Sequence, residues 1–241
     1  NLNVTGNESV YTTIQGGGNN RHFYIGSGAP TLTLRWLNLT GGHATSAHGG
    51  SIYSHGGRLY ISDNIFYKNR VGGGKSGGAI VAYSFFAFLA NTKFIENSAA
   101  NDGGAVFLQL GKLNSRNVQY IQNKANGNGA GGALYLKSLM AGSTMNNDLF
   151  LLNEAGGAGG GIRIHGSYDA PSTLVMTQTI FKQNKQTPSA NILYGGGGIS
   201  IDTNVTMSIR ECMFIENEAE DSGHQIRTIN APSITLVNTN F

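Results

Sequence analysis

The sequence predicts an all-β fold, a parallel β-helix that winds through about seven to eight coils of about 28 residues. Two short elements alternate along the chain. A Gly-Gly step opens each repeat, at Gly49, Gly77, Gly103, Gly131, Gly159, Gly196 and, in degenerate form, Gly223, with intervals of 28, 26, 28, 28, 37 and 27 residues. A Phe-x-x-Asn element or a close variant follows about sixteen residues later. Regular repetition at this length indicates a solenoid.

Composition decides between helical and β-solenoids. The chain has 36 Gly in 241 residues, and each would cost a helix about 1 kcal/mol. Between the glycines, apolar residues alternate with a period of two, as in strands. One predicted inward column is Ile52, Ile80, Val106, Leu134, Ile162, Ile199 and Ile226. A second, of mostly small residues, is Asn64, Thr92, Val118, Asp148, Thr179, Cys212 and Thr239.

Glycine and asparagine are expected to form the corners of each coil. The paired glycines suit a positive φ or a close approach between coils. The Asn of Phe-x-x-Asn tolerates the left-handed conformation of a turn. Its side chains are expected to stack as an internal amide ladder, one per coil. The ladder residues would be Asn69, Asn97, Asn123, Asn153, Asn184 and Asn217.

The chain divides into two regions of one continuous body. Residues 1–48 form an irregular N-terminal region, with strands expected at 10–15 and 22–25 and a first coil at 31–42. Residues 49–241 form the repeat β-helix. The chain begins without Met, and its last repeat stops at Phe241, before the expected Asn. We therefore expect a fragment of a longer protein.

Low charge argues against several classes of partner. Only 12% of residues are charged and the net charge is +3, so nucleic acid is a poor candidate.

The longest apolar run, at 79–90, is too short to span a bilayer. The single cysteine, Cys212, falls in an inward column and is expected to be a buried, unreactive thiol.

A family resemblance rests on both repeated elements. GGAI at Gly77, GGAV at Gly103 and GGAL at Gly131, paired with closers such as FIEN and FLLN, resemble the repeats of the chlamydial polymorphic outer membrane protein family and related β-helix passenger domains. The resemblance covers residues 49–241. It implies a right-handed parallel β-helix at a cell surface, with an adhesive or structural role. Secreted proteins of other organisms carry the same repeats, so a bacterial source does not follow.

The chain departs from the family pattern at two kinds of position. Arg163 and Arg227 stand where apolar outward residues are expected, and the coil that begins at Gly159 has about nine extra residues.

We expect no catalytic residues, no cofactor and no metal site. A polysaccharide lyase or hydrolase remains an alternative, since such enzymes need clustered carboxylates. The six Asp are scattered over different coils, although pairs such as Arg163 with Asp169 or Arg210 with Glu211 are conceivable. Ice binding is a second alternative, but the threonines do not repeat in one outward column.

The predicted partner surface is an outward stripe. Tyr53, Val81, Phe107 and Tyr135 would lie in register on four consecutive coils, and exposed apolar patches of this size mark partner surfaces. Alternatively, a loop of the same chain covers the stripe, and the segment at 186–194 is the best candidate for that loop.

Four Asn-x-Ser/Thr sequons and a charge-poor surface favour an extracellular or cell-surface location. The candidate glycosylation sites are Asn3, Asn7, Asn38 and Asn204. The sequence therefore predicts a non-catalytic structural or adhesive module without a membrane span in this segment. Its expected partners are other copies of itself, which could assemble into filaments, other surface proteins, or glycans.

Overall fold

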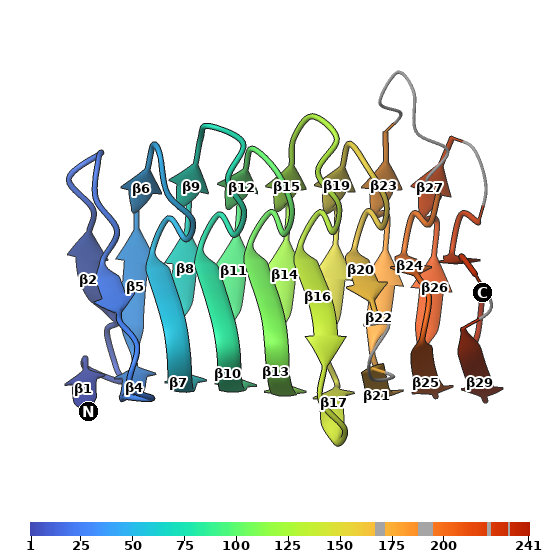
Figure 1. The fold of residues 1–241 in the computed structure, drawn as a ribbon, viewed down its shortest axis with the longest axis horizontal. Helices are drawn as coiled ribbons and strands as arrows, with labels where there is room; N and C mark the ends of the chain where they lie inside the picture. Colours follow the sequence, from blue (N-terminus) through green and yellow to red (C-terminus); the bar gives the residue numbers. More distant parts are fainter. Residues whose placement is uncertain (167–171, 188–194, 221–222, 231) are drawn as a thin grey trace.

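The computed structural model describes residues 1–166, 172–187, 195–220, 223–230 and 232–241. Within them the chain winds into a parallel β-solenoid of about 8 turns, each of about 28 residues, which confirms the predicted fold class. The coils lie side by side along one axis, with the two chain ends at opposite ends of it (Figure 1). The described residues form no helix, and so none that could cross a membrane.

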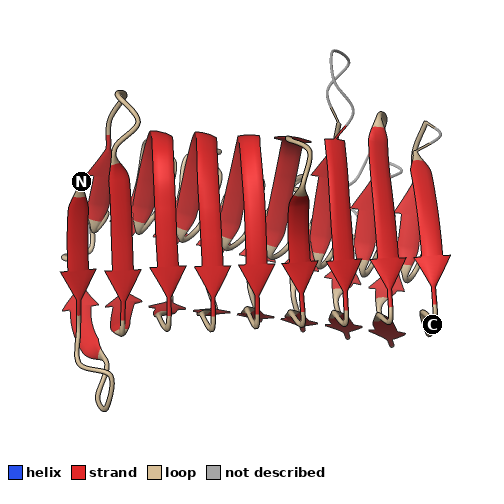
Figure 2. Ribbon diagram, turned by 90° about the horizontal axis from the view of Figure 1, so that it is seen from below, coloured by secondary structure: helices blue, strands red, loops and turns tan. Residues whose placement is uncertain are grey.

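Three parallel sheets run along the axis, and each coil contributes strands to them (Figure 2). We call the largest the long sheet. It consists of β1 (Leu2–Thr5), β3 (Phe23–Ile25), β4 (Thr31–Arg35), β7 (Ile52–Ser62), β10 (Ile80–Ala90), β13 (Val106–Arg116), β16 (Leu134–Leu139), β17 (Ser143–Asn146), β20 (Ile162–His165), β21 (Ser172–Thr177), β24 (Ile199–Ile201), β25 (Val205–Arg210), β28 (Ile226–Thr228) and β29 (Ser233–Val237).

The other two sheets are built from shorter strands. The second sheet consists of β2 (Thr12–Gln15), β5 (Leu37–Thr40), β8 (Ile65–Tyr67), β11 (Lys93–Ile95), β14 (Gln119–Ile121), β18 (Leu149–Leu151), β22 (Ile180–Lys182) and β26 (Met213–Ile215). The third consists of β6 (His43–Ala44), β9 (Arg70–Val71), β12 (Ser98–Ala99), β15 (Lys124–Ala125), β19 (Glu154–Ala155), β23 (Lys185–Gln186) and β27 (Glu218–Ala219).

The corners of each coil differ from the sequence prediction in one respect. The left-handed residue before the third sheet is not the Asn of Phe-x-x-Asn but the residue preceding it. These residues are Lys68, Glu96, Gln122, Leu152, Gln183 and Glu216, with φ between 49° and 56°. The reason is geometric: the residue before the Asn turns the chain with its own side chain exposed, which leaves the Asn side chain directed into the core.

The paired glycines serve the two purposes predicted for them. The first of each pair has a positive φ, such as 63° at Gly103. The second lies against the next coil, since a Cβ placed on Gly104 would be only 2.0 Å from the carbonyl oxygen of Gly132. A side chain at the second position would therefore force neighbouring coils apart, whereas one at the first would strain the backbone and clash within its own coil, as at Gly103 with the carbonyl of Val106.

The predicted asparagine ladder is present and fully buried. Asn97 shows its geometry: Nδ2 donates to Oδ1 of Asn123 at 3.0 Å and to the carbonyl of Phe66 at 2.9 Å. The backbone N–H of Asn97 also donates to Oδ1 of Asn123, at 3.0 Å. At one end of the ladder, Oδ1 of Asn69 accepts the N–H of Gly42. At the other end, Nδ2 of Asn217 donates to the side-chain oxygen of Gln225. The hydrogen bonds between these amides thus replace the hydrogen bonds to water that each amide loses on burial.

A second stack fills the core beside this ladder. The aromatic rings of the Phe-x-x-Asn elements lie parallel, with centroids of neighbouring rings 4.6 to 5.1 Å apart within the series from Phe66 to Phe214. Tyr120 belongs to this buried stack. The rings and the inward aliphatic residues make one continuous core along the axis.

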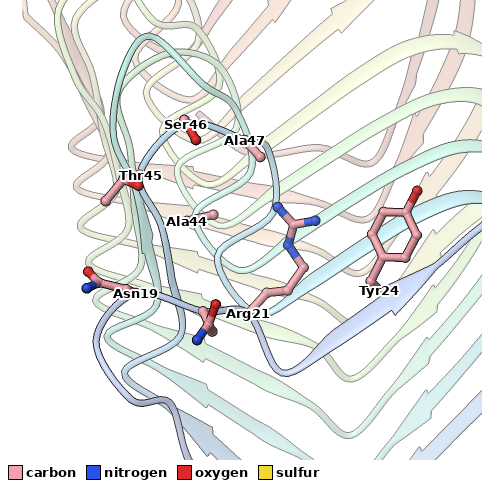
Figure 3. A pocket seen from close by; sticks show the side chains of 8 residues that line it. Asn19, Arg21, Tyr24, Ala44, Thr45, Ser46 and Ala47 are labelled. Carbon is pink, nitrogen blue, oxygen red and sulfur yellow. The ribbon is translucent and has the colours of Figure 1, made fainter.

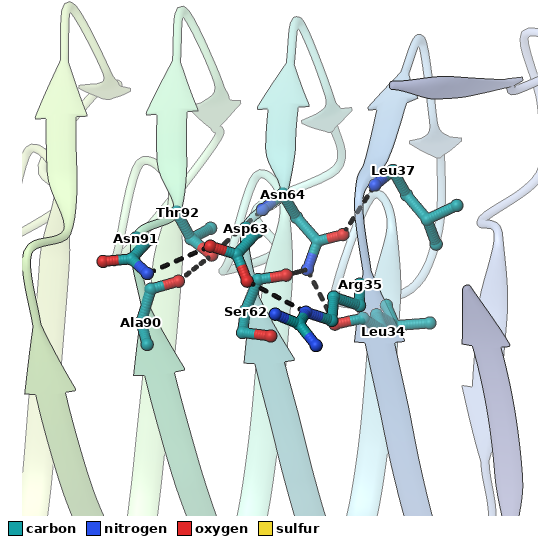
Figure 4. A network of polar contacts seen from close by, with 9 residues as sticks. All are labelled: Leu34, Arg35, Leu37, Ser62, Asp63, Asn64, Ala90, Asn91 and Thr92. Carbon is teal, nitrogen blue, oxygen red and sulfur yellow. Dashed lines mark hydrogen bonds and ion pairs between the residues drawn. The ribbon is translucent and has the colours of Figure 1, made fainter. Parts of the chain in front are cut away.

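The corner after the long sheet carries the small inward column (Figure 4). Asn64 accepts the N–H of Leu37 at 2.9 Å and donates to the carbonyls of Leu34 and Ser62 at 2.9 and 2.8 Å. Thr92, one coil later, donates to the carbonyl of Ala90 at 2.8 Å. Asn64 and Thr92 therefore each donate a hydrogen bond to the carbonyl two residues earlier.

Asp148 occupies the same column, buried as predicted. Its Oδ1 accepts the N–H of Val118 at 2.8 Å, and its Oδ2 has no hydrogen-bond partner among the described residues. Burial raises the pKa of Asp148 to about 7, although the nearby Ser115 hydroxyl and the N–H of Val118 oppose the shift. Cys212, in the same column, is also buried, and burial raises the pKa of its thiol.

Replacing a ladder residue should destabilise the protein strongly. Asn123→Ala removes the acceptor of the Asn97 N–H, one of the two acceptors of Asn97 Nδ2, and the Asn123 donor to the carbonyl of Phe94. Each orphaned buried group costs about 1 to 3 kcal/mol, so we expect a loss of several kcal/mol, measured as a lower urea midpoint. Asn114→Ala in the same coil, whose side chain faces outward, is the control. Equal effects of the two variants would refute the role given to the ladder.

The stability of the protein should fall as pH rises towards 7. Folded Asp148 keeps its proton up to a pH of about 7, whereas the unfolded group has lost it above 3.8. The folded state therefore binds more protons between these values, so the stability that Asp148 contributes is fully present below 3.8 and is lost as pH rises through 7. At about 1.4 kcal/mol per pKa unit the decline amounts to a few kcal/mol.

Asp148→Asn tests this assignment. The introduced amide keeps the acceptor for Val118 and can donate to the carbonyl of Asn146, as Asn64 does to Ser62. We expect the variant to be more stable than the wild type at pH 8 and nearly equal to it at pH 4, by thermal unfolding. A small slope should remain, because burial also raises the pKa of Asp102. A variant with the full wild-type pH dependence would contradict the assignment.

Candidate binding face

The outer face of the long sheet is the candidate site, and a bend divides it in two. Residues of positive φ interrupt the long strands: Gly56 in β7, Ser84 in β10 and Leu110 in β13. Before the bend lie the first halves of these strands, and after it the second halves, which the structure keeps in register across coils. Alternate residues of both halves point outward, so the face carries columns of side chains parallel to the axis.

The predicted stripe is in register but is not an exposed surface. Tyr53 pairs with Val81, Val81 with Phe107, and Phe107 with Tyr135. However, Val81 is 0% exposed and Phe107 only 6%, while Tyr53 and Tyr135 are half-buried. The chain's own glycine loops are responsible in part: a Cβ on Gly77 would lie 2.3 Å from Cγ2 of Val81. The segment at 186–194, proposed as a cover, lies mostly outside the described residues.

The structure assembles a different aromatic row on the first halves. Tyr24, Tyr53, Tyr83, Phe107 and Tyr135 follow one another with ring centroids 5.5, 6.0, 6.0 and 5.2 Å apart. Two members of this row were not predicted from the sequence. Tyr24 lies in the irregular N-terminal region, where no repeat marks it. Tyr83 was detectable, because it lies two residues after Val81 and so faces the same way.

A polar hollow of about 390 Å³ lies at the N-terminal end of this row (Figure 3). Its lining includes Arg21, Tyr24 and the loop from Ala44 to Ala47. The guanidinium of Arg21 lies 5.3 Å from the ring centre of Tyr53 and 5.8 Å from that of Tyr24. Arg21 is thus held by aromatic faces, which leaves it less available to a ligand.

The second halves carry three exposed aromatic residues on adjacent strands, here called the aromatic patch. Tyr60, Phe86 and Phe88 are 38%, 42% and 36% exposed. The rings of Tyr60 and Phe88 are in register on neighbouring strands and stack with centroids 4.9 Å apart. No sequence signal marked these residues, because they follow the bend and do not recur in other coils.

A charged cluster lies on the face near the C-terminal end. Asp202 Oδ2 contacts Arg163 Nη2 at 2.7 Å and His165 Nδ1 at 2.8 Å, and its Oδ1 accepts the N–H of Thr203 at 2.8 Å. Partial burial favours the neutral form of Asp202, but the hydrogen bonds from Thr203 and His165 and the charge of Arg163 outweigh it and lower its pKa. Arg163 is only 7% exposed.

Neither pairing suggested by sequence is seen among the described residues. Asp169, the suggested partner of Arg163, lies outside the described residues. Arg210 donates from Nε to the hydroxyl of Ser208 at 2.9 Å rather than pairing with Glu211. Among the described residues, no group of three or more His, Cys, Asp or Glu side chains could hold a metal ion.

The four sequon asparagines differ in accessibility. Asn3, Asn7 and Asn204 are exposed. Asn38 is half-buried within β5, with its Nδ2 3.5 Å from the hydroxyl of Thr13. Three of the four therefore have an exposed side-chain amide to which a glycan could be attached.

Comparison of the chain with models of known protein families, with curated protein sequences and with solved structures gives no match. Function is therefore inferred from the side chains that the fold places on this face.

Proposed function

We propose that this protein is a non-catalytic adhesive module displayed outside the cell, and that it binds its partner with the outer face of the long sheet. The observation that carries the proposal is the aromatic patch, because Tyr60, Phe86 and Phe88 are exposed together on adjacent strands. Exposed aromatic clusters of this kind are typical of partner surfaces.

Rigidity of the face supports a binding role. The patch lies on strands that are hydrogen-bonded on both sides, and the core beneath it is closed by Leu59, Ala87 and Leu89, which are 1 to 3% exposed. A preorganised surface loses little conformational entropy when it binds. The three exposed sequon asparagines are consistent with an extracellular location.

The ice-binding alternative finds no support in the register of this face. Thr31 aligns with Arg58, and Thr33 aligns with Tyr60. The threonines therefore do not form a regular array across these coils.

Polysaccharide cleavage is a second candidate because of one observation, the contact of His165 with Asp202 beside Arg163. A carboxylate that orients an imidazole is an arrangement used in general acid–base catalysis. The burial of Arg163 favours a structural role instead, in which the pair neutralises charges that the fold covers.

Replacing two residues of the aromatic patch should weaken adhesion strongly. We expect labelled wild-type protein to bind saturably to one or more members of a panel of intact cells and polysaccharide-coated beads, measured by flow cytometry. Phe86→Ser combined with Phe88→Ser should weaken that binding at least tenfold, since central aromatic residues are typical hot spots.

The matched control is Ile180→Ser combined with Met213→Ser. These residues are 37% and 40% exposed and neighbour each other in register on the second sheet, so the pair removes similar apolar area from another face. Equal losses from both double variants, or no saturable binding of the wild type, would count against the adhesive role.

The enzymatic alternative has its own test. If His165 and Asp202 are catalytic, the protein should release reducing or unsaturated ends from a polysaccharide panel, and Asp202→Asn should lower that rate by a factor of about 100 or more. We expect no release by the wild type. Release that Asp202→Asn abolishes, with circular dichroism unchanged, would overturn the non-catalytic assignment.

A further inference from the structure

A shallow hollow of about 510 Å³ lies on the second halves of the long strands, next to the aromatic patch. It spans β10, β13 and β17, and its lining includes Phe88, Lys112, Asn114, Arg116, Thr144 and Asn146. The column that contains Tyr60 and Phe88 continues as Asn114 and then Thr144. Because the latter two side chains are smaller than a ring, the surface falls away after Phe88 and forms the hollow.

Phe88 forms one wall of this hollow. Tyr60 covers one side of its ring, with the two planes only 8° apart, and the smaller Asn114 lies on the other side. One aromatic face is therefore open towards the hollow. An open aromatic face beside polar side chains suits the C–H face of a sugar ring, which is apolar while the ring's edge carries hydroxyl groups.

Two cations flank the hollow. Lys112 and Arg116 lie two residues before and two residues after Asn114 on β13, so all three side chains point outward together. The ammonium of Lys112 is directed towards the turn before β17, because a Cβ on Gly142 would lie 3.0 Å from its Nζ. Arg58 stands in the same column as Lys112, two coils earlier.

No carboxylate balances these charges on the same part of the face. Along the second halves of β7, β10 and β13 and along β17, the outward residues include no Asp or Glu. The ion pairs found within the described residues do not involve Arg58, Lys112 or Arg116. The hollow therefore has positive potential and favours an anionic ligand.

Uncharged hydrogen-bonding groups lie between the cations. The hydroxyl of Thr144 donates to Oδ1 of Asn114 at 3.3 Å, which leaves the amide of Asn114 free to donate. Asn146 lines the hollow beside Arg116. Amides and hydroxyls at this spacing can exchange hydrogen bonds with the hydroxyl groups of a sugar.

We propose that this hollow binds an acidic sugar residue, a uronate or a sulfated hexose, within a polysaccharide chain. Lys112 and Arg116 bind the carboxylate or sulfate group, Phe88 packs against the ring, and Asn114, Thr144 and Asn146 bind the hydroxyls. This assignment rests on the proposed adhesive function and names the ligand class of the same face. Single-stranded nucleic acid fits less well, because it requires successive stacking platforms and Phe88 is the one aromatic residue that lines this hollow.

Titration calorimetry with three probes tests the proposal: an oligogalacturonate, a sulfated heparin oligosaccharide and a neutral cello-oligosaccharide of matched length. We expect binding of one or both acidic probes at least tenfold tighter than of the neutral one, and the stronger of the two identifies the anionic group. Lys112→Gln combined with Arg116→Gln should weaken acidic binding at least tenfold, and Phe88→Ala should weaken it severalfold. Circular dichroism verifies that each variant is folded.

Lys93→Gln is the matched control, because Lys93 is exposed on the second sheet and lacks an ion pair within the described residues. The proposal is overturned if neither acidic probe binds, if Lys93→Gln weakens binding as much as the double variant, or if Phe88→Ala has no effect. Equal affinity for single-stranded DNA with the same variant profile would also overturn it, since it would indicate general polyanion attraction.

The cell-binding assay separates failure of this inference from failure of the adhesive function. If Phe86→Ser with Phe88→Ser abolishes cell binding while acidic oligosaccharides neither bind nor compete, the adhesive function stands and the acidic-sugar assignment fails. If the wild type binds neither cells nor oligosaccharides, both fail.

Discussion

The buried asparagine ladder is the interaction on which the rest of this structure depends. An amide withdrawn from water is costly unless its donors and its acceptor are paired. Asn97, Asn123 and their equivalents meet that condition only when each coil lies in register on the next. A coil displaced by one residue would leave these buried groups unpaired, so the ladder fixes the register of the coils as well as stabilising them.

Register at the ladder propagates to the outer surface. At the glycine pairs, neighbouring coils are too close for one coil to slide along the next. The same coils also contribute strands to all three sheets, so the register is the same in each sheet. Outward side chains therefore form columns whose composition depends only on which residue each coil supplies. Aromatic, cationic and small polar residues in adjacent positions of such columns produce the aromatic patch, the hollow beside Phe88 and its positive potential.

The small inward column shows how a repeat tolerates a polar exception. Thr92 and Thr179 donate to the carbonyl two residues earlier, and Asn64 does the same through its amide. A protonated Asp148 can supply a comparable donor, whereas an ionised one presents only lone pairs to a buried carbonyl. Burial raises the pKa of Asp148, because an ionised carboxylate loses its hydration in this column, and this favours the protonated form.

The sequence by itself determined the β-helix, the inward columns, the glycine corners and the asparagine ladder, because stacking requirements recur in each coil and leave a periodic pattern. The position of the left-handed residue was predicted one residue too late, because Lys68 and its equivalents are not of a residue type that favours the left-handed conformation. Only the tertiary structure decided which outward residues reach solvent. Val81 and Phe88 are both apolar and outward, yet the first is covered and the second exposed. Arg163 and Asp202 meet although 39 positions apart in sequence, because contacts between coils depend on loop lengths and register that no single repeat encodes.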